Sequence, residues 1–216
     1  MKMAVSITGI VIAVFVIILA VVAVLFLFYR FYFLRKPERK VPGGRVIVSP
    51  ASGKVVRILD IGKEGYKTVE KGLLGRVKLL TKDVGDAGYL IVIMMTPFDV
   101  HFQRAPADGR VEKVSHRKGK FLNAVKDAES MQALENENNS ILMSCPGIGR
   151  IKVVQVAGFL ARRIRCFVCP KQKIHKGEEI GLICLGSQVI LVTPKLKIRV
   201  KEGQRVVDGE TIIAGF

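Results

Sequence analysis

The sequence predicts a mainly β (α+β) fold, in which an N-terminal transmembrane helix is followed by a single β-rich domain. Three observations lead to this prediction. Residues 3–28 contain no charged side chain, the rest of the chain is rich in short segments of β-branched residues, and two motifs each occur twice. A chain of 216 residues has room for one anchor and one domain of ordinary size.

The first apolar run, residues 3–28, is long enough to cross a bilayer, since about 20 apolar residues span the hydrocarbon core. The alternative is a cleaved signal peptide, which would have a shorter apolar run, a positive charge ahead of it and a small-residue cleavage site after it. Here only Lys2 precedes the run. We therefore expect an uncleaved anchor (residues 1–32), a basic linker (33–45) and a β-rich domain (46–216).

The charges after the anchor predict its direction. Five basic residues follow the apolar run closely: Arg30, Arg35, Lys36, Arg39 and Lys40. The positive-inside rule therefore predicts a cell-membrane protein whose C-terminal domain lies on the cytoplasmic side. Aromatic residues at position 29 and at positions 31–33 are typical of the belt that forms at a membrane interface.

Strands are expected throughout the domain, in segments that are rich in β-branched residues and bounded by Gly, Pro or Asp. The expected strands are residues 46–48, 54–59, 77–80, 89–94, 110–114, 140–143, 151–156, 164–168, 190–193 and 198–200. A weak helical pattern covers residues 124–134. The domain is therefore predicted to be mainly β.

Two internal repeats support a β-rich domain. Residues 49–55 echo residues 105–111, and residues 173–180 echo residues 205–212. Each copy of the second motif places a Gly-Glu turn between short apolar strands, and the glycine supplies the positive backbone dihedral of a tight turn. The pattern resembles the lipoyl-like barrel sandwich, although no lysine lies in a lipoyl or biotin attachment motif.

The net charge predicts an anionic partner. There are 35 Lys and Arg residues against 18 Asp and Glu, which gives a formal net charge of +17. Nucleic acid is disfavoured, because the basic residues are dispersed and only 7% of the chain is aromatic. An anionic membrane surface agrees with the predicted anchor.

The four cysteines are Cys145, Cys166, Cys169 and Cys184. The two-residue gap between Cys166 and Cys169 is typical of a zinc or redox site, but no second pair at matching spacing follows. Both cysteines lie in or beside a strand-like run, where residues three apart point to opposite faces. Buried, reduced thiols are therefore favoured over a metal site, as in a cytoplasmic domain.

Of the three histidines, His101 is the best candidate for proton transfer. It follows an apolar run and a short loop, close to Asp99 and Arg104. Taken alone, this pattern favours a structural histidine over a catalytic one. His175 lies in a Gly-Glu turn and is expected to be exposed.

Seven segments, in one order, resemble the short type of the phosphatidylserine decarboxylase family, which includes archaeal archaetidylserine decarboxylases. They are residues 33–39 (Phe-Leu-Arg-Lys-Pro-Glu-Arg), 48–55 (Val-Ser-Pro-Ala-Ser-Gly-Lys-Val), 99–106 (Asp-Val-His-Phe-Gln-Arg-Ala-Pro), 116–124, 135–139 (Glu-Asn-Glu-Asn-Asn), 153–163 and 185–188 (Leu-Gly-Ser-Gln). Each segment is a weak signal by itself. Seven of them in one order are a strong signal, and the resemblance spans nearly the whole chain from about residue 33.

The resemblance implies an autocatalytically processed, pyruvoyl-dependent decarboxylase. Ser187 would attack the Gly186 carbonyl and form an ester. Elimination would then release a β chain (1–186) with a free carboxylate, and hydrolysis with loss of ammonia would leave an α chain (187–216) that begins with a pyruvoyl group. That ketone would form a Schiff base with the amine of a serine phospholipid, either phosphatidylserine or archaetidylserine, and would release the ethanolamine lipid. The two chains would form a heterodimer, and a higher oligomer stays open.

The resemblance also implies roles for individual residues. Ser187 and His101 would be catalytic, with His101 as the proton donor or as an assistant in self-cleavage. Processing or substrate binding would involve Ser52, Asp99, Arg104, Asp108 and His116, and Arg104, Arg162 or Arg163 would either hold the lipid phosphate or lie in solvent.

Two positions depart from the family pattern. Many relatives carry Asp, where this chain has Ser52, to help a histidine activate the serine, and long-type relatives carry a second histidine where this chain has Arg104. Three alternatives follow: Asp99 or Asp108 supplies the carboxylate, self-cleavage runs by another arrangement, or cleavage is slow. A decarboxylase-like protein that does not cleave itself and a non-enzymatic membrane adaptor with a lipoyl-like barrel are the alternatives.

Overall fold

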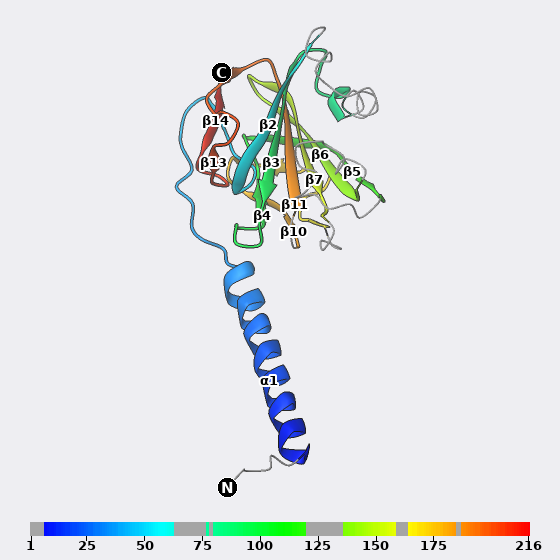
Figure 1. Ribbon diagram of the computed structural model, residues 1–216. Helices are drawn as coiled ribbons and strands as arrows, with labels where there is room; N and C mark the ends of the chain where they lie inside the picture. The colour runs from blue at the N-terminus through cyan, green and yellow to red at the C-terminus, as the bar shows by residue number, and fades with distance from the viewer. Residues whose placement is uncertain (1–6, 63–76, 78–79, 120–135, 159–163, 185–186) are drawn as a thin grey trace. The chain divides into compact units, whose positions relative to one another are not determined.

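The computed structural model describes residues 7–62, 77, 80–119, 136–158, 164–184 and 187–216 (Figure 1). The chain forms two compact units, residues 1–35 and residues 36–216. The predicted mainly β fold with one N-terminal apolar helix is confirmed.

The first unit contains the predicted apolar helix. The α-helix α1 (Ile7–Leu27) continues as a π-helix, η1 (Phe28–Phe33), and none of the residues of α1 is buried against protein. The helical segment from Ile7 to Phe33 is 27 residues long, and its most apolar stretch of 18 residues has a mean hydropathy of 3.6. At about 1.5 Å of rise per residue, this length is sufficient to cross a hydrocarbon core of about 30 Å.

The described residues of the second unit form one large sheet and two small ones, and the strand pairs among them are antiparallel. In order, the main sheet consists of β13 (Arg205–Val206), β2 (Gly53–Ile61), β3 (Gly88–Met95), β11 (Ser187–Pro194), β7 (Gly149–Val156), β6 (Asn138–Cys145), β5 (Gly109–Arg117) and β9 (Lys173–Ile174). The small sheets are β1 (Val46–Val48), β14 (Ile212–Gly215) and β12 (Lys197–Ile198), and β4 (Phe102–Arg104), β10 (Glu179–Ile183) and β8 (Ile164–Cys166).

The central strands of the main sheet are buried on both faces. In β11, Val189 and Leu191 belong to the main core, whereas Ile190 and Val192 belong to a second apolar cluster. Successive side chains of a strand point to opposite faces, so a continuous apolar run is what a doubly covered strand requires. This is why β11 is apolar throughout its middle.

The internal repeats predicted from the sequence occupy equivalent places at the two edges of the main sheet. Gly53 and Lys54 pair with β13, and Gly109 and Arg110 pair with β9 in the same register. Each copy carries a bulge at the same position, after Val55 in one and after Val111 in the other. The sequence repeats therefore correspond to a structural repeat.

The turn glycines of the second repeat behave as predicted. Gly177 and Gly209 have φ angles of +84° and +74°, which favour glycine. Gly177 N–H donates to the Ala105 carbonyl at 2.9 Å, and Gly209 N–H donates to the Ser49 carbonyl at 2.8 Å. Each Gly-Glu turn is therefore docked on one copy of the first repeat.

One predicted strand is wrong. Residues 77–80 were expected to form a strand, but Val77, Leu80 and Thr81 are helical. Val77, Leu80 and Val84 contact the second apolar cluster, and their spacing of three and four residues matches one face of a helix. The expected strand assumed a repeat of two residues, whereas the apolar residues follow the 3.6-residue repeat of a helix. The helix expected at residues 124–134 lies outside the described residues.

The cysteines also differ in part from the expectation. Cys145 is buried as a free thiol, but Cys169 is exposed, and Cys166 and Cys184 are intermediate. Strand β8 ends before Cys169, which begins a turn closed by Gln172 N–H at 3.3 Å from the Cys169 carbonyl. The predicted burial of Cys169 is therefore wrong, and the strand expected at residues 164–168 ends at Cys166.

Candidate active site

The end of strand β3 brings His101 and the start of β11 to one end of the main sheet. Met95, the last residue of β3, pairs with Ser187, the first residue of β11. A short loop leads from Met95 to His101, whose carbonyl accepts a hydrogen bond from Ile183 N–H at 3.3 Å. Ile183 is four residues ahead of Ser187 in the chain. Gly186 lies outside the described residues.

The imidazole of His101 has a defined tautomer. The side chain is completely buried, and its Nδ1 lies 2.8 Å from the carbonyl oxygen of Asp99. A carbonyl oxygen only accepts, so Nδ1 carries the hydrogen. In the neutral ring, Nε2 is then the nitrogen with the lone pair, and it is the atom that can accept or return a proton.

The carboxylate of Asp99 has other partners. It accepts hydrogen bonds from the backbone N–H and the hydroxyl of Thr96, both at 2.8 Å, and it forms an ion pair with Arg205. Asp99 therefore orients His101 through its main chain, while its carboxylate holds the loop that precedes His101.

Three buried amide side chains run in series to His101, and we call Asn139, Gln155 and Gln103 the amide relay. Asn139 Nδ2 donates to Gln155 Oε1, and Gln155 Nε2 donates to Gln103 Oε1, both at 2.8 Å. Gln103 Nε2 then donates to the His101 carbonyl at 2.7 Å. The His101 carbonyl can only accept a hydrogen bond, so Gln103 must turn its NH2 group toward it. The oxygen of Gln103 then faces Gln155, and the oxygen of Gln155 faces Asn139, so the orientation of all three amides is set. Gly181 packs so closely that a Cβ there would lie 2.3 Å from Gln155 Nε2.

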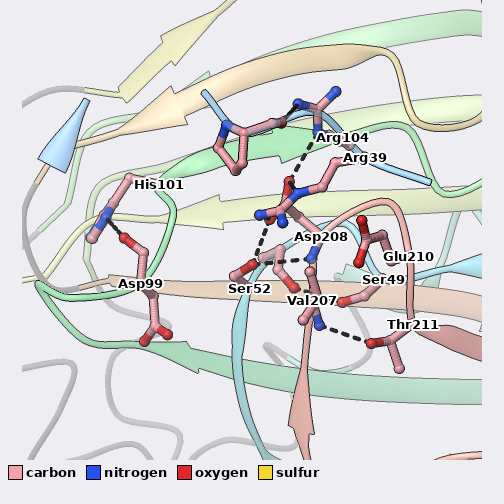
Figure 2. A network of polar contacts seen from close by, with 12 residues as sticks. Arg39, Ser49, Ser52, Asp99, His101, Arg104, Val207, Asp208, Glu210 and Thr211 are labelled. Carbon is pink, nitrogen blue, oxygen red and sulfur yellow. Dashed lines mark hydrogen bonds and ion pairs between the residues drawn. The ribbon is translucent and has the colours of Figure 1, made fainter. Parts of the chain in front are cut away.

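A second polar cluster surrounds Asp208, as Figure 2 shows. The Ser52 hydroxyl donates to Asp208 Oδ1 at 2.5 Å, and Asp208 N–H donates back to Ser52 Oγ at 3.1 Å. Arg39 Nη2 lies 2.5 Å from Oδ1, and Arg104 Nε lies 2.9 Å from Oδ2. The Asp208 side chain is fully buried, so its charge is balanced by two guanidinium groups in place of water.

The donors of Arg104 are largely committed to this part of the fold. Besides Asp208, the guanidinium donates to the Gly177 carbonyl at 2.8 Å and to the Pro37 carbonyl at 3.5 Å, and it lies 3.6 Å from Glu179. Arg104 ends β4, the strand that begins directly after His101. Through Arg104 and Gln103, β4 is therefore held at its end and from its buried side.

Comparison with known proteins decides the affiliation of the chain. The family model described as phosphatidylserine decarboxylase matches residues 26–214. The chain belongs to the phosphatidylserine decarboxylase family. A phosphatidylserine decarboxylase proenzyme of Chlorobaculum tepidum is 37% identical over 91% of this chain and 82% of the relative. One of Nitrobacter winogradskyi is 36% identical over 85% of this chain and 68% of the relative. The resemblance seen in the sequence is thus confirmed.

Asp208 is a residue of this family member that sequence reasoning missed. Asp99 and Asp108 were considered as sources of a carboxylate near Ser52, but the carboxylate beside Ser52 belongs to Asp208, 156 residues away in the chain. The repeats held the signal, because Asp208 aligns with Lys176 as Ser52 aligns with Asp108. Lys176 N–H donates to Asp108 at 2.9 Å, which is the equivalent of the bond from Asp208 N–H to Ser52.

The remaining predicted site residues have other surroundings. Asp108 is exposed and lies 3.6 Å from the exposed His175, whose predicted exposure is confirmed. His116 is half exposed and lies 3.0 Å from Glu137. The structure thus groups His101 with Asp99, and Ser52 with Arg104. Arg162 and Arg163 lie outside the described residues.

Proposed function

We propose that this chain is a proenzyme that cleaves itself between Gly186 and Ser187 and decarboxylates a serine phospholipid with a pyruvoyl group formed from Ser187. Family membership supports decarboxylation of phosphatidylserine, a lyase reaction of phospholipid biosynthesis, and both relatives are called proenzymes. The observation that carries the proposal is the pairing of Ser187 with Met95 at the end of the sheet where His101 follows.

The position of Ser187 fits a pyruvoyl group. Ser187 is the first residue of β11, so a break ahead of it leaves all eight paired positions between β11 and β3 in place. A new chain end can therefore form without loss of a sheet ladder. When present, a pyruvoyl group supplies a ketone that withdraws electrons from the substrate carbon that loses carbon dioxide.

His101 is the residue that we propose for proton transfer. Its Nδ1 is held by the Asp99 carbonyl, which leaves Nε2 to accept the proton of the Ser187 hydroxyl during cleavage or to donate one to the substrate carbon. A positioned acid or base contributes about a hundredfold to ten-thousandfold to a rate. Replacing His101 with Ala should therefore slow the reaction by at least about a hundredfold.

Asp208 supplies a carboxylate next to Ser52, the position where the family pattern carries an aspartate. We propose that the pair of Ser52 and Asp208 takes the place of that aspartate. The negative charge then comes from Asp208 in the C-terminal segment. Arg39 and Arg104 bind the carboxylate firmly, so its role is to position β4 and the histidine loop.

The two products of cleavage would stay together as a heterodimer. Strand β11 of the C-terminal fragment lies between β3 and β7 of the other fragment, and Asp208 pairs with Arg39 and Arg104 across the two. Separation would expose the middle of the sheet and a buried carboxylate. The fragments should therefore remain bound unless the domain unfolds.

The substrate would be reached at a membrane. The apolar helix and the net charge of +17 favour a protein anchored at an anionic surface, with the domain on the cytoplasmic side. The headgroup chemistry is the same for ester-linked and ether-linked lipids. Parallel assays with phosphatidylserine and archaetidylserine would show which of the two is used.

Intact-mass analysis of the purified chain tests the proposal. We expect an N-terminal fragment ending at residue 186 and a C-terminal fragment whose first residue carries a carbonyl, with neither in Ser187→Ala. Ser144→Ala, an exposed serine of β6, is the matched control and should be cleaved normally. The same preparations, in vesicles that contain phosphatidylserine, should form the ethanolamine lipid only when cleaved.

Two outcomes would contradict the proposal. An active protein with an intact Gly186–Ser187 bond would exclude the pyruvoyl chemistry. An intact and inactive protein would favour the alternatives, a non-cleaving relative or a membrane adaptor built on a lipoyl-like barrel.

A further inference from the structure

A cavity of about 330 Å³ lies over strands β5, β6 and β7. Its floor includes Val154 and Val156, which alternate along β7 with Gln155 of the amide relay. Alternate residues of a strand point to opposite faces, so the cavity and the amide relay lie on opposite faces of the main sheet. The cavity is therefore separate from the cluster around His101.

The cavity has an excess of positive charge. Among the described residues that line it, four are basic (Lys82, Lys113, Arg117 and Lys152) and one, Asp83, is acidic. Lys152 is almost completely buried, and its Nζ lies 2.7 Å from both Asp83 Oδ2 and the Leu80 carbonyl. The carboxylate of Asp83 is thus paired with Lys152, the buried lysine of the cavity lining.

The other two lysines act on the same carboxylate. The hydrogen bond from Lys152 lowers the pKa of Asp83, and the charges of Lys113 and Lys82 lower it further against the opposing effect of burial. Lys152 therefore contacts the carboxylate directly, and Lys113 and Lys82, which line the same cavity, add positive charge near it. An added anion at the cavity rim would reduce their mutual repulsion and would gain attraction from Lys82 and Lys113.

The uncharged lining completes a site for an amphiphilic anion. Leu142, Val154 and Val156 form apolar surface, and Ser115 and Ser140 bring hydroxyl groups to the same space. Ligand sites of about 300–1,000 Å³ combine apolar walls with a few polar groups, and this cavity is at the small end of that range. It suits a phosphorylated headgroup with its first carbons, but not whole acyl chains.

We propose that this cavity binds the phosphodiester of an anionic glycerophospholipid. An anionic headgroup such as phosphoserine would bind better than a zwitterionic one. The lysines repel the ammonium group of any such ligand, and only the serine headgroup carries a carboxylate of its own that offsets this repulsion. If the proposed function is correct, the cavity would retain the anionic substrate and release the neutral product, and this consequence rests on that function. The binding itself does not, because the cavity lies on the other face of the sheet.

Calorimetry on the full chain carrying Ser187→Ala tests the binding without turnover. In neutral detergent, the probes are dihexanoyl phosphatidylserine, glycerophosphoserine and dihexanoyl phosphatidylcholine. Lys82→Gln with Lys113→Gln should weaken binding of the anionic probes about tenfold, as expected for two partly screened charge contacts. Lys197→Gln with Lys201→Gln removes the same charge from exposed positions outside the cavity lining and should change nothing.

The probes separate the possible sources of the phosphodiester. Tighter binding of the short-chain lipid than of glycerophosphoserine assigns the site to a membrane lipid, and equal binding assigns it to a soluble headgroup. Either result supports the site. Equal affinity in the two double variants, or equally tight binding of phosphatidylcholine, would overturn it. Decarboxylation by the cavity variant with Ser187 intact is assayed separately, so failure of the site and failure of the proposed function are distinguishable.

Discussion

Replacing Gln103 with leucine tests whether the amide relay positions His101. The change removes the donor to the His101 carbonyl and leaves Gln155 Nε2 buried without its acceptor, while the volume of the side chain is nearly kept. A buried donor that loses its partner costs about 1–3 kcal/mol. We expect the free energy of unfolding to fall by about that amount.

The effect on self-cleavage should exceed the effect of lower stability. Without the hydrogen bond from Gln103, the His101 carbonyl keeps the one from Ile183 N–H, and the histidine can shift relative to the start of β11. A misplacement of about 1 Å can cost a hundredfold in rate, so we expect cleavage to slow by about tenfold to a hundredfold. Intact mass, followed over time after synthesis in a cell-free system, measures this rate.

A glutamate at the same position adds a readout that a purely structural role would not affect. When protonated, Gln103→Glu can donate to the His101 carbonyl and accept from Gln155, as the native amide does. When ionised, it can only accept, and it repels the His101 carbonyl. Burial raises the pKa of such a carboxyl group, so cleavage by this variant should speed up as the pH falls.

The matched control is Ile151→Ala, a buried position in the half of β7 away from Gln155. A buried isoleucine replaced by alanine costs about 2–5 kcal/mol, yet the folded control should cleave at the native rate. The positioning role is refuted if Gln103→Leu cleaves as fast as the native chain, or if Gln103→Glu shows no dependence on pH beyond that of the native chain.

Three further predictions concern buried charges and thiols. Asp208→Asn should destabilise the domain by about 3–5 kcal/mol in a denaturant titration, because it leaves the guanidinium of Arg104 without its buried carboxylate, and an unchanged midpoint would argue against the cluster. Burial raises the pKa of Cys145 from 9.0 to about 12, so the unfolded chain loses this proton first and stability should fall as the pH rises from about 9, an effect absent in Cys145→Ala. Lys152 lowers the pKa of Asp83, so this carboxylate stabilises the fold above its unfolded pKa of 3.8 and ceases to do so as the pH falls further; Asp83→Asn should lower stability at neutral pH and remove that acid-dependent loss.

The repeats show how much of the fold a local pattern can predict. Residues 49–55 and 105–111 dock Gly-Glu turns in the same register, and their bulges match. Turn glycines, β-branched runs and alternation act over a few residues, so they can be read along the chain. The segment around Val77 shows the limit, because a short apolar run fits a helix and a strand equally well.

The candidate site shows a different limit. His101 and the Gly186–Ser187 pair stood out through local motifs, but Asp208 and the amide relay did not. Gln155 and Gln103 are 52 residues apart, and nothing in either local sequence distinguishes them from solvated amides. Their importance follows from burial, because an amide removed from water must find a partner inside the protein.

The apolar helix, the β-rich domain, the repeats and the family could be predicted from the sequence, because each depends on residue types at short or fixed spacing. The carboxylate beside Ser52, the His101 nitrogen that faces the Asp99 carbonyl and the cavity that the basic residues share were established only by the tertiary structure. These features depend on contacts between distant strands. Such contacts form when antiparallel pairing and core burial fix the register of the strands. A local sequence pattern does not specify which distant residues this register brings together.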